Sequence, residues 1–133
     1  MTTLIVPDGS AVVALLTDPG PNGEWVAEVT QAAALVAPAL LPFEVANVLW
    51  RLERSGQISS HTATQAHLDL AELAVEMWPY AALAARVWDL RANMTSYDAS
   101  YVAVAEAAGA TLVTLDQHLA RSPGISCRIA VAP

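Results

Sequence analysis

Short aliphatic runs alternate with amphipathic segments along most of the chain. Five runs have the length and composition of buried strands, at residues 4–6, 35–38, 75–78, 111–115 and 127–131. The segments between them favour helices, at residues 11–18, 24–34, 42–56, 61–73, 81–94 and from about 96 to 108. This alternation predicts an α/β fold in which helices cover both faces of a central, mostly parallel sheet.

Residues that cap or end helices mark several of these boundaries. Pro42 suits the first position of its helix, and Gly56 suits the position after the last turn. Thr95 or Ser96 can cap the later helix, which Gly109 then ends. No internal repeat, low-complexity tract or interdomain linker interrupts the pattern, so residues 1–133 are expected to form a single domain.

Two aspartates lie at opposite ends of the apolar stretch TSYDASYVAVAEAAGATLVTLDQ, residues 95–117. The helix that follows Asp98 travels about 15 Å, at roughly 1.5 Å per residue. The strand at residues 111–115 returns about 16 Å, at roughly 3.3 Å per residue. Because the two paths nearly cancel, Asp98 and Asp116 are expected at the same edge of the sheet.

Two further acids follow the same rule. Asp8 comes after the first predicted strand, and Glu44 lies in the first turn of the helix after the second. Open α/β sheets bind ligands outside the carboxyl ends of their strands, so four carboxylates are expected to converge there. Each acid also has a purely structural explanation. Asp98 fits a capping box, Glu44 suits the helix dipole, Asp116 can cap the next helical turn, and Asp8 can shape a tight turn.

As a set, the four acids indicate a cation site. Two carboxylates about 4 Å apart repel each other by roughly 4 kcal/mol at an effective dielectric constant of 20, so a cluster must take up protons or a cation. Hard oxygen ligands favour Mg²⁺ or Mn²⁺. The chain has no cysteine and histidine grouping that zinc would select; its histidines are interpreted as surface or capping residues: His61, His67 and His118.

Such a site is suited to phosphodiester hydrolysis. A divalent ion lowers the pKa of a bound water and stabilises the negative charge that develops in the reaction. Ser10, Asn47 and Thr114 are candidates to orient the carboxylates or the water. Asn47 lies one helical turn after Glu44, so both side chains are expected to face the same place.

The amino-acid composition predicts a partner surface and argues against a membrane or secreted protein. The chain is 55% hydrophobic, which predicts a partner surface on a domain of this size. Its longest apolar run, residues 32–43, is broken by Pro38 and Pro42 and is shorter than the ~20 residues of a membrane span, so no membrane association is expected. The N-terminus lacks a secretory pattern and Cys127 is the single cysteine, which together predict a cytoplasmic protein.

The formal net charge of −7 argues against passive adhesion to nucleic acid, because neutralisation of phosphates drives that kind of binding. A role on nucleic acid would need bound cations. All six basic residues are arginines, and the absence of lysine argues against a receiver or haloacid-type phosphotransfer domain, which uses a lysine near the phosphoryl group.

Three segments resemble the signature regions of the PIN-domain ribonucleases, and specifically of VapC-type toxins from bacterial toxin-antitoxin pairs. They are VPDGSAVVALL, LLPFEVANVL and TSYDASYVAVAEAAGATLVTLD, and the resemblance runs from about residue 4 to residue 119. It implies a PIN-like three-layer α/β/α fold and a Mg²⁺- or Mn²⁺-dependent endoribonuclease. It also implies a homodimer inhibited by a small antitoxin whose tail occupies a groove beside the active site, with structured RNA such as transfer or ribosomal RNA as the target.

By this resemblance the metal-binding and catalytic acids are Asp8, Glu44, Asp98 and Asp116, with Ser10 and Thr114 in supporting roles. Other residues have two interpretations each. Arg51 and Arg54 either contact substrate phosphates or form surface ion pairs. Phe43, Ala46 and Trp50 either form a groove for the antitoxin or fill the core or a dimer contact.

One part of the sequence departs from the family pattern. Pro7 and Gly9 flank Asp8, where an aliphatic residue and a small residue such as alanine or threonine are expected. Pro7 removes a backbone donor and Gly9 is expected to loosen the following turn, which makes the placement of Asp8 less certain. A catalytically silent PIN-like module that only binds a partner protein is therefore the alternative interpretation.

Overall fold

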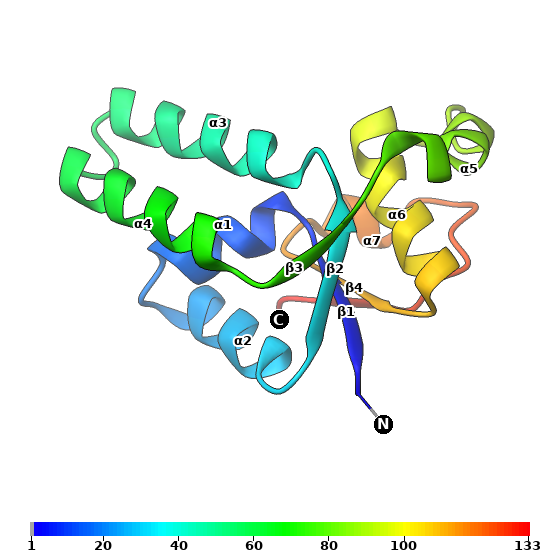
Figure 1. The fold of residues 1–133 in the computed structure, drawn as a ribbon, viewed down its shortest axis with the longest axis horizontal. Helices are drawn as coiled ribbons and strands as arrows, with labels where there is room; N and C mark the ends of the chain where they lie inside the picture. The colour runs from blue at the N-terminus through cyan, green and yellow to red at the C-terminus, as the bar shows by residue number, and fades with distance from the viewer. Residues whose placement is uncertain (1) are drawn as a thin grey trace.

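The computed structural model describes residues 2–133 and places five parallel strands in one sheet (Figure 1). The strands are β1 (Leu4–Pro7), β2 (Ala34–Pro38), β3 (Val75–Trp78), β4 (Thr111–Thr114) and β5 (Ile129–Val131). Their order across the sheet is β3-β2-β1-β4-β5, with register pairs such as Ile5 with Leu35 and Val6 with Leu112. The predicted parallel α/β architecture is confirmed.

Helices lie on both faces of this sheet. They are α1 (Gly9–Thr17), α2 (Pro21–Thr30), α3 (Leu41–Arg54), α4 (Ser60–Glu72), the 3-10 turn η1 (Tyr80–Ala82), α5 (Ala84–Asp89), α6 (Ser96–Ala108) and α7 (Gln117–Ala120). Successive strand residues point to opposite faces, so Ile5 packs with Val26 of α2 while Val6 packs in the cluster that contains α6. Helices α3 and α4 form an antiparallel pair beside α1 (Figure 1). None of the helices in residues 2–133 is both long enough and apolar enough to cross a membrane.

Two predicted helices differ from the structure by more than two residues at one end or both. The predicted helix at 24–34 instead runs from Pro21 to Thr30, because Ala32 adopts a left-handed conformation with φ of 62° and the chain turns into β2. The predicted helix at 81–94 is instead the 3-10 turn Tyr80–Ala82 followed by α5, which ends at Asp89. There the backbone tightens, because the Leu90 N–H donates to the carbonyls of both Arg86 and Val87, and residues 90–94 continue as turns.

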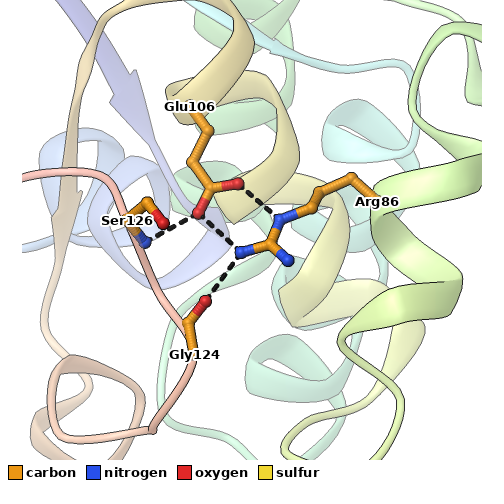
Figure 2. A network of polar contacts seen from close by, with 4 residues as sticks. All are labelled: Arg86, Glu106, Gly124 and Ser126. Carbon is orange, nitrogen blue, oxygen red and sulfur yellow. Dashed lines mark hydrogen bonds and ion pairs between the residues drawn. The ribbon is translucent and has the colours of Figure 1, made fainter.

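An ion pair outside the cavity-lining acids attaches the segment before β5 to helices α5 and α6 (Figure 2). The Arg86 guanidinium donates to both carboxylate oxygens of Glu106, at 2.6 and 3.0 Å, and to the carbonyl of Gly124 at 2.6 Å. The backbone N–H of Ser126 donates to Glu106 at 2.7 Å. One carboxylate therefore joins α5, α6 and the segment before β5.

Glu106→Gln is expected to lower the free energy of unfolding by about 1 kcal/mol, since the pair is partly exposed to solvent. The hydrogen bond from Arg86 lowers the pKa of Glu106 below its ordinary value of 4.5. A depressed acid pKa means that the stabilisation is complete above the unfolded value and is lost as the pH falls through the folded value. Urea denaturation at neutral pH and below pH 4 measures the free energy of unfolding, which should become equal for the wild type and Glu106→Gln in acid.

Glu72→Gln serves as the control, because Glu72 is an exposed acid on α4. An equal loss of stability in Glu72→Gln would contradict the role of the ion pair.

Candidate active site

The candidate site lies where the order of the strands reverses, between the carboxyl ends of β1 and β4. An open cavity of about 780 Å³ occupies this edge. All four predicted acids line it, and each comes from a different segment of the chain: Asp8, Glu44, Asp98 and Asp116. Among residues 2–133, Asp18 adds a fifth carboxylate to the wall and Arg51 is the one basic residue there.

Asp8 is the most buried of the four acids and caps α1. Its Oδ1 accepts hydrogen bonds from the Ala11 N–H at 3.0 Å and from the Ser10 hydroxyl at 2.6 Å. Its Oδ2 accepts from the Thr114 hydroxyl at 2.5 Å. Burial raises the pKa of Asp8, the three hydrogen bonds oppose that rise, and the charge of Asp116 adds to it. Asp8 therefore caps a helix instead of shaping a tight turn.

The Thr114 side chain, at the end of β4, forms hydrogen bonds with both Asp8 and Asp116. Besides donating to Asp8, its fully buried hydroxyl accepts a hydrogen bond from the Asp116 N–H at 2.9 Å. The Ser10 hydroxyl accepts from the Leu115 N–H at 3.1 Å. The two hydroxyls thus fix the ends of β1 and β4 relative to each other and hold the Asp8 carboxylate in one orientation.

Glu44 reaches the cavity from the first turn of α3. The Tyr101 hydroxyl, on the buried face of α6, donates to Glu44 Oε1 at 2.9 Å. Burial raises the pKa of Glu44; the Tyr101 hydrogen bond opposes that rise, and the charges of Asp8 and Asp98 add to it. The Tyr101 pKa is raised as well, first by burial and then by the charge of Glu44, so the phenol keeps its proton and remains a donor.

The absence of a side chain at Gly9 leaves space for the Glu44 carboxylate. A Cβ atom at position 9 would come within 2.0 Å of Glu44 Oε1 and 2.9 Å of its carboxyl carbon. Gly9 is the first residue of α1 and is buried, so it does not loosen a turn as the sequence suggested. The glycine that departs from the family pattern therefore provides space for one of the four acids.

Asp98 and Asp116 complete the wall of the cavity in different ways. Asp116 caps α7, where its Oδ1 accepts from the N–H groups of His118 and Leu119 at 2.8 and 3.2 Å. The Asp98 N–H donates to the Thr95 hydroxyl, but the Asp98 carboxylate makes no hydrogen bond to residues 2–133, so the capping box is only half formed. Burial is the largest cause of the raised pKa of Asp98. The charges of Asp116 and Asp8 raise this pKa further, and His118 lowers it.

The four carboxylates surround the cavity without forming a ready-made cluster. Within residues 2–133, no three histidine, cysteine, aspartate or glutamate side chains lie close enough together to hold a metal ion as they stand. Asp8, Glu44 and Asp116 each accept hydrogen bonds from their own surroundings. The donor set nevertheless fits Mg²⁺ or Mn²⁺: it consists of carboxylate oxygens, and the charges of Asp8, Glu44 and Asp98 repel one another.

The sequence matches the family model for the PIN domain over residues 5–124. It is 37% identical over 130 residues to VapC ribonuclease Mb0985 of Mycobacterium bovis, covering 98% of this chain and 99% of that protein. The chain belongs to the PIN-domain family. The predicted resemblance to VapC-type ribonucleases is confirmed, and ribonucleases of this kind generally depend on divalent metal ions.

Solved structures agree with this assignment. PAE2754 from Pyrobaculum aerophilum superposes with a TM-score of 0.66 at 28% identity, over 96% of this chain and 83% of that one. A chain of VapBC2 from Rickettsia felis, in a structure bound to a DNA fragment from the promoter, has a TM-score of 0.69 at 14% identity, over 98% and 100% of the two chains. The predicted PIN-like three-layer fold is confirmed.

Pro7 is compatible with the strand that carries Asp8 in this PIN domain. The Asp8 N–H donates to the Val113 carbonyl at 3.0 Å, so alternate donors of β1 point towards β4. A donor at position 7 would have pointed towards β2. The register between β1 and β2 pairs only Leu4 and Ile5, so Pro7 lies beyond it. The missing N–H therefore removes no bond that positions Asp8.

The remaining predicted residues of the PIN domain are divided among three places. Arg51 lines the acidic cavity and a neighbouring one, and Asn47 lines only the neighbour, together with Phe43 and Glu44. Ala46 and Trp50 line a cavity of about 230 Å³ between α3 and α4. The Arg54 guanidinium lies over the Trp50 ring, 5.1 Å from its centroid, and lines neither the acidic cavity nor its neighbour.

The sequence patterns did not indicate the role of three residues of this site. Tyr101 follows Asp98 by three positions on α6, and that helical spacing is the pattern that would have indicated a shared face. His118 is the second residue after Asp116, and its charge acts on Asp98. Gly9 was noticed, but its proximity to Glu44 depends on the packing of α1 against α3, which no local pattern reports.

Proposed function

We propose that this protein is an endoribonuclease and the toxin of a toxin-antitoxin pair, in which the four acids bind Mg²⁺ or Mn²⁺ and hydrolyse RNA. The observation that carries the proposal is the single cavity at the switch point, lined by four carboxylates from separate segments. Burial and mutual repulsion raise the pKa of three of them, which is the environment that a divalent cation neutralises.

The roles of the residues follow from their contacts. Asp8, Glu44, Asp98 and Asp116 would hold the ion, which supplies an acidified water and stabilises the charge that develops on the phosphate. Ser10 and Thr114 keep the Asp8 carboxylate fixed, and Tyr101 does the same for Glu44. Asp98, the one carboxylate of the four without a hydrogen bond in residues 2–133, is free to orient either the ion or the attacking water.

Arg51 is the one basic side chain in the cavity wall and is positioned to contact a phosphate of the substrate. Arg54 is engaged with Trp50, so its part in phosphate binding is proposed only for a rearranged side chain. Asn47 is proposed to act on the substrate from the neighbouring cavity. The four acids account for more than half of the net charge of −7, so bound cations would remove much of the repulsion that RNA meets.

The partners follow from the family. The Mycobacterium bovis relative is a ribonuclease and the Rickettsia felis structure is a VapBC assembly, so an RNA substrate and a small antitoxin are proposed here. Ala46 and the exposed ring of Trp50 offer a groove between α3 and α4 that suits an apolar segment of the antitoxin. We further propose that the protein is a single-domain, cytoplasmic homodimer. Its proposed target is transfer or ribosomal RNA.

Metal removal tests the activity. Purified protein should cleave total RNA in Mg²⁺ or Mn²⁺, cleavage should stop in EDTA, and added Mn²⁺ should restore it. Asp98→Asn, purified in parallel, should not cleave, whereas Asp69→Asn on the exposed face of α4 should cleave like the wild type. Cleavage in EDTA, or equal cleavage by Asp98→Asn, would contradict the proposal. Binding of a partner protein with no cleavage under any metal would indicate the silent module instead.

A further inference from the structure

A second cavity, of about 550 Å³, lies beside the acidic one, between the start of α3 and the first turn of α6. Its wall consists of Leu40, Phe43, Glu44, Asn47, Arg51 and Tyr97. Glu44 and Arg51 also line the acidic cavity, so the two spaces share a border. A molecule whose phosphate lies at the four acids therefore has a neighbouring space into which its next chemical group can extend.

Two aromatic rings in this wall are turned largely to solvent. Phe43 is 80% exposed and Tyr97 is 64% exposed, and they come from helices far apart in the sequence. Exposed rings are stacking surfaces for flat ligands, and stacking is how proteins bind the bases of single-stranded nucleic acid. The volume is within the range of small-ligand sites.

The polar groups of the wall suit a neutral, hydrogen-bonding ring. The exposed Asn47 amide makes no side-chain hydrogen bond to residues 2–133, so both its donor and its acceptor are available. The second cavity has one carboxylate and one guanidinium among residues 2–133, so the charges of its wall cancel. The acidic cavity has five carboxylates and the same guanidinium, so it takes cations and the phosphate attached to them, whereas the second cavity favours an uncharged group.

We propose that this second cavity, named here the base subsite, binds one unpaired nucleobase of the RNA next to the cleaved phosphodiester. The inference rests on the proposed ribonuclease function. The base stacks on Phe43 and Tyr97, and the Asn47 amide bonds to its edge. A base stacked in a duplex cannot present its face to these rings, so the bound base must be unpaired or flipped out of its helix.

Phe43 lines this subsite and does not line the cavity between α3 and α4. Ala46 and Trp50 of the same helix line the separate cavity between α3 and α4. Phe43 instead shares its cavity with Glu44, one of the four acids. This continuity with the acidic cavity favours RNA as the occupant over a second copy of the chain.

The test uses a pool of RNA hairpins with random loop sequences, cleaved in Mn²⁺ and sequenced at the cut ends. Phe43→Leu and Tyr97→Leu, which remove the rings and keep apolar side chains, should each raise KM by about 10-fold. Their kcat should change much less. Asn47→Ala should weaken the base preference at one position beside the cut. Trp88→Leu, an exposed tryptophan that lines neither cavity, is the matched control and should cleave like the wild type.

A second substrate separates stacking from general damage to the enzyme. A hairpin with an abasic residue at the preferred position should be cut slowly by the wild type and no more slowly by Phe43→Leu. Wild-type KM and base preference in all three variants would overturn the base subsite while leaving the ribonuclease proposal intact. So would a change of oligomeric mass in Phe43→Leu with unchanged cleavage, because the ring would then contact a second copy. No cleavage by the wild type would refute the ribonuclease proposal and the base subsite with it.

Discussion

Asp98→Asn should lower the rate of RNA cleavage by about 100-fold or more and, in EDTA at pH 7, should leave thermal stability equal or higher. Asparagine has nearly the same shape as aspartate but carries no charge. The Asp98 carboxylate accepts no hydrogen bond from residues 2–133, so the substitution breaks none. Helix α6 keeps its cap, because the Thr95 hydroxyl accepts from the backbone N–H at position 98 and not from the carboxylate.

The stability effect follows from the sign of the pKa shift. Burial raises the folded pKa of Asp98 above its ordinary value of 3.8, so the ionised form is less favourable in the folded protein than in the unfolded chain. The destabilisation is complete above the folded pKa and disappears as the pH falls to the unfolded value. Mn²⁺ should therefore raise the Tm of the wild type and have little effect on Asp98→Asn.

Asp69→Asn provides the control for Asp98→Asn, because Asp69 is exposed on α4 and lines neither the acidic cavity nor the base subsite. Differential scanning calorimetry with and without Mn²⁺ measures the stability effect, and a labelled RNA measures cleavage. If Asp98→Asn lowers the Tm in EDTA and still gains stability from Mn²⁺, the carboxylate has a structural role and does not bind the ion.

Thr114→Val should lower both the free energy of unfolding and the affinity for Mn²⁺. Valine matches threonine in shape but leaves Asp8 Oδ2 and the Asp116 N–H without the hydroxyl that bonds to both. Loss of the partner of a buried polar group typically costs about 1–3 kcal/mol. Loss of a hydrogen bond that orients a metal ligand typically reduces metal affinity about 10-fold to 100-fold.

Thr111→Val is the matched control for this prediction. Thr111 begins the same strand, is only partly buried, and its hydroxyl makes no side-chain hydrogen bond to residues 2–133. Urea denaturation should separate the two variants, and isothermal titration with Mn²⁺ should show weaker binding for Thr114→Val alone. Equal effects of the two substitutions would mean that the strand, and not the hydroxyl network around Asp8, is sensitive to the loss of threonine.

Several features that local sequence patterns determine were predicted correctly. Thr95 caps α6, Gly109 ends it in a left-handed conformation, and Asp116 caps α7. Periodicity identified the strands, and the parallel α/β pattern then placed Asp8, Glu44, Asp98 and Asp116 at one edge, where the structure has its acidic cavity. Each of these predictions needs only near neighbours in the sequence and the fixed rise of helices and strands.

The features that depend on packing between distant elements were not predictable in this way. Tyr101 reaches Glu44 only because α6 and α3 come together at one edge of the sheet, and Gly9 accommodates Glu44 because α1 packs on α3. Phe43, Ala46 and Trp50 share one helix but line two different cavities, since α4 covers part of α3 and leaves its start open. A pattern along one helix does not contain that information.

The central claim is that carboxylates from four separate segments hold a divalent ion. A crystal of the protein soaked in Mn²⁺ and measured at the manganese absorption edge tests it most directly. The account predicts an anomalous peak in the acidic cavity, about 2.0–2.3 Å from oxygens of at least two of Asp8, Glu44, Asp98 and Asp116. An ordered cavity with no anomalous peak at saturating Mn²⁺ would contradict it.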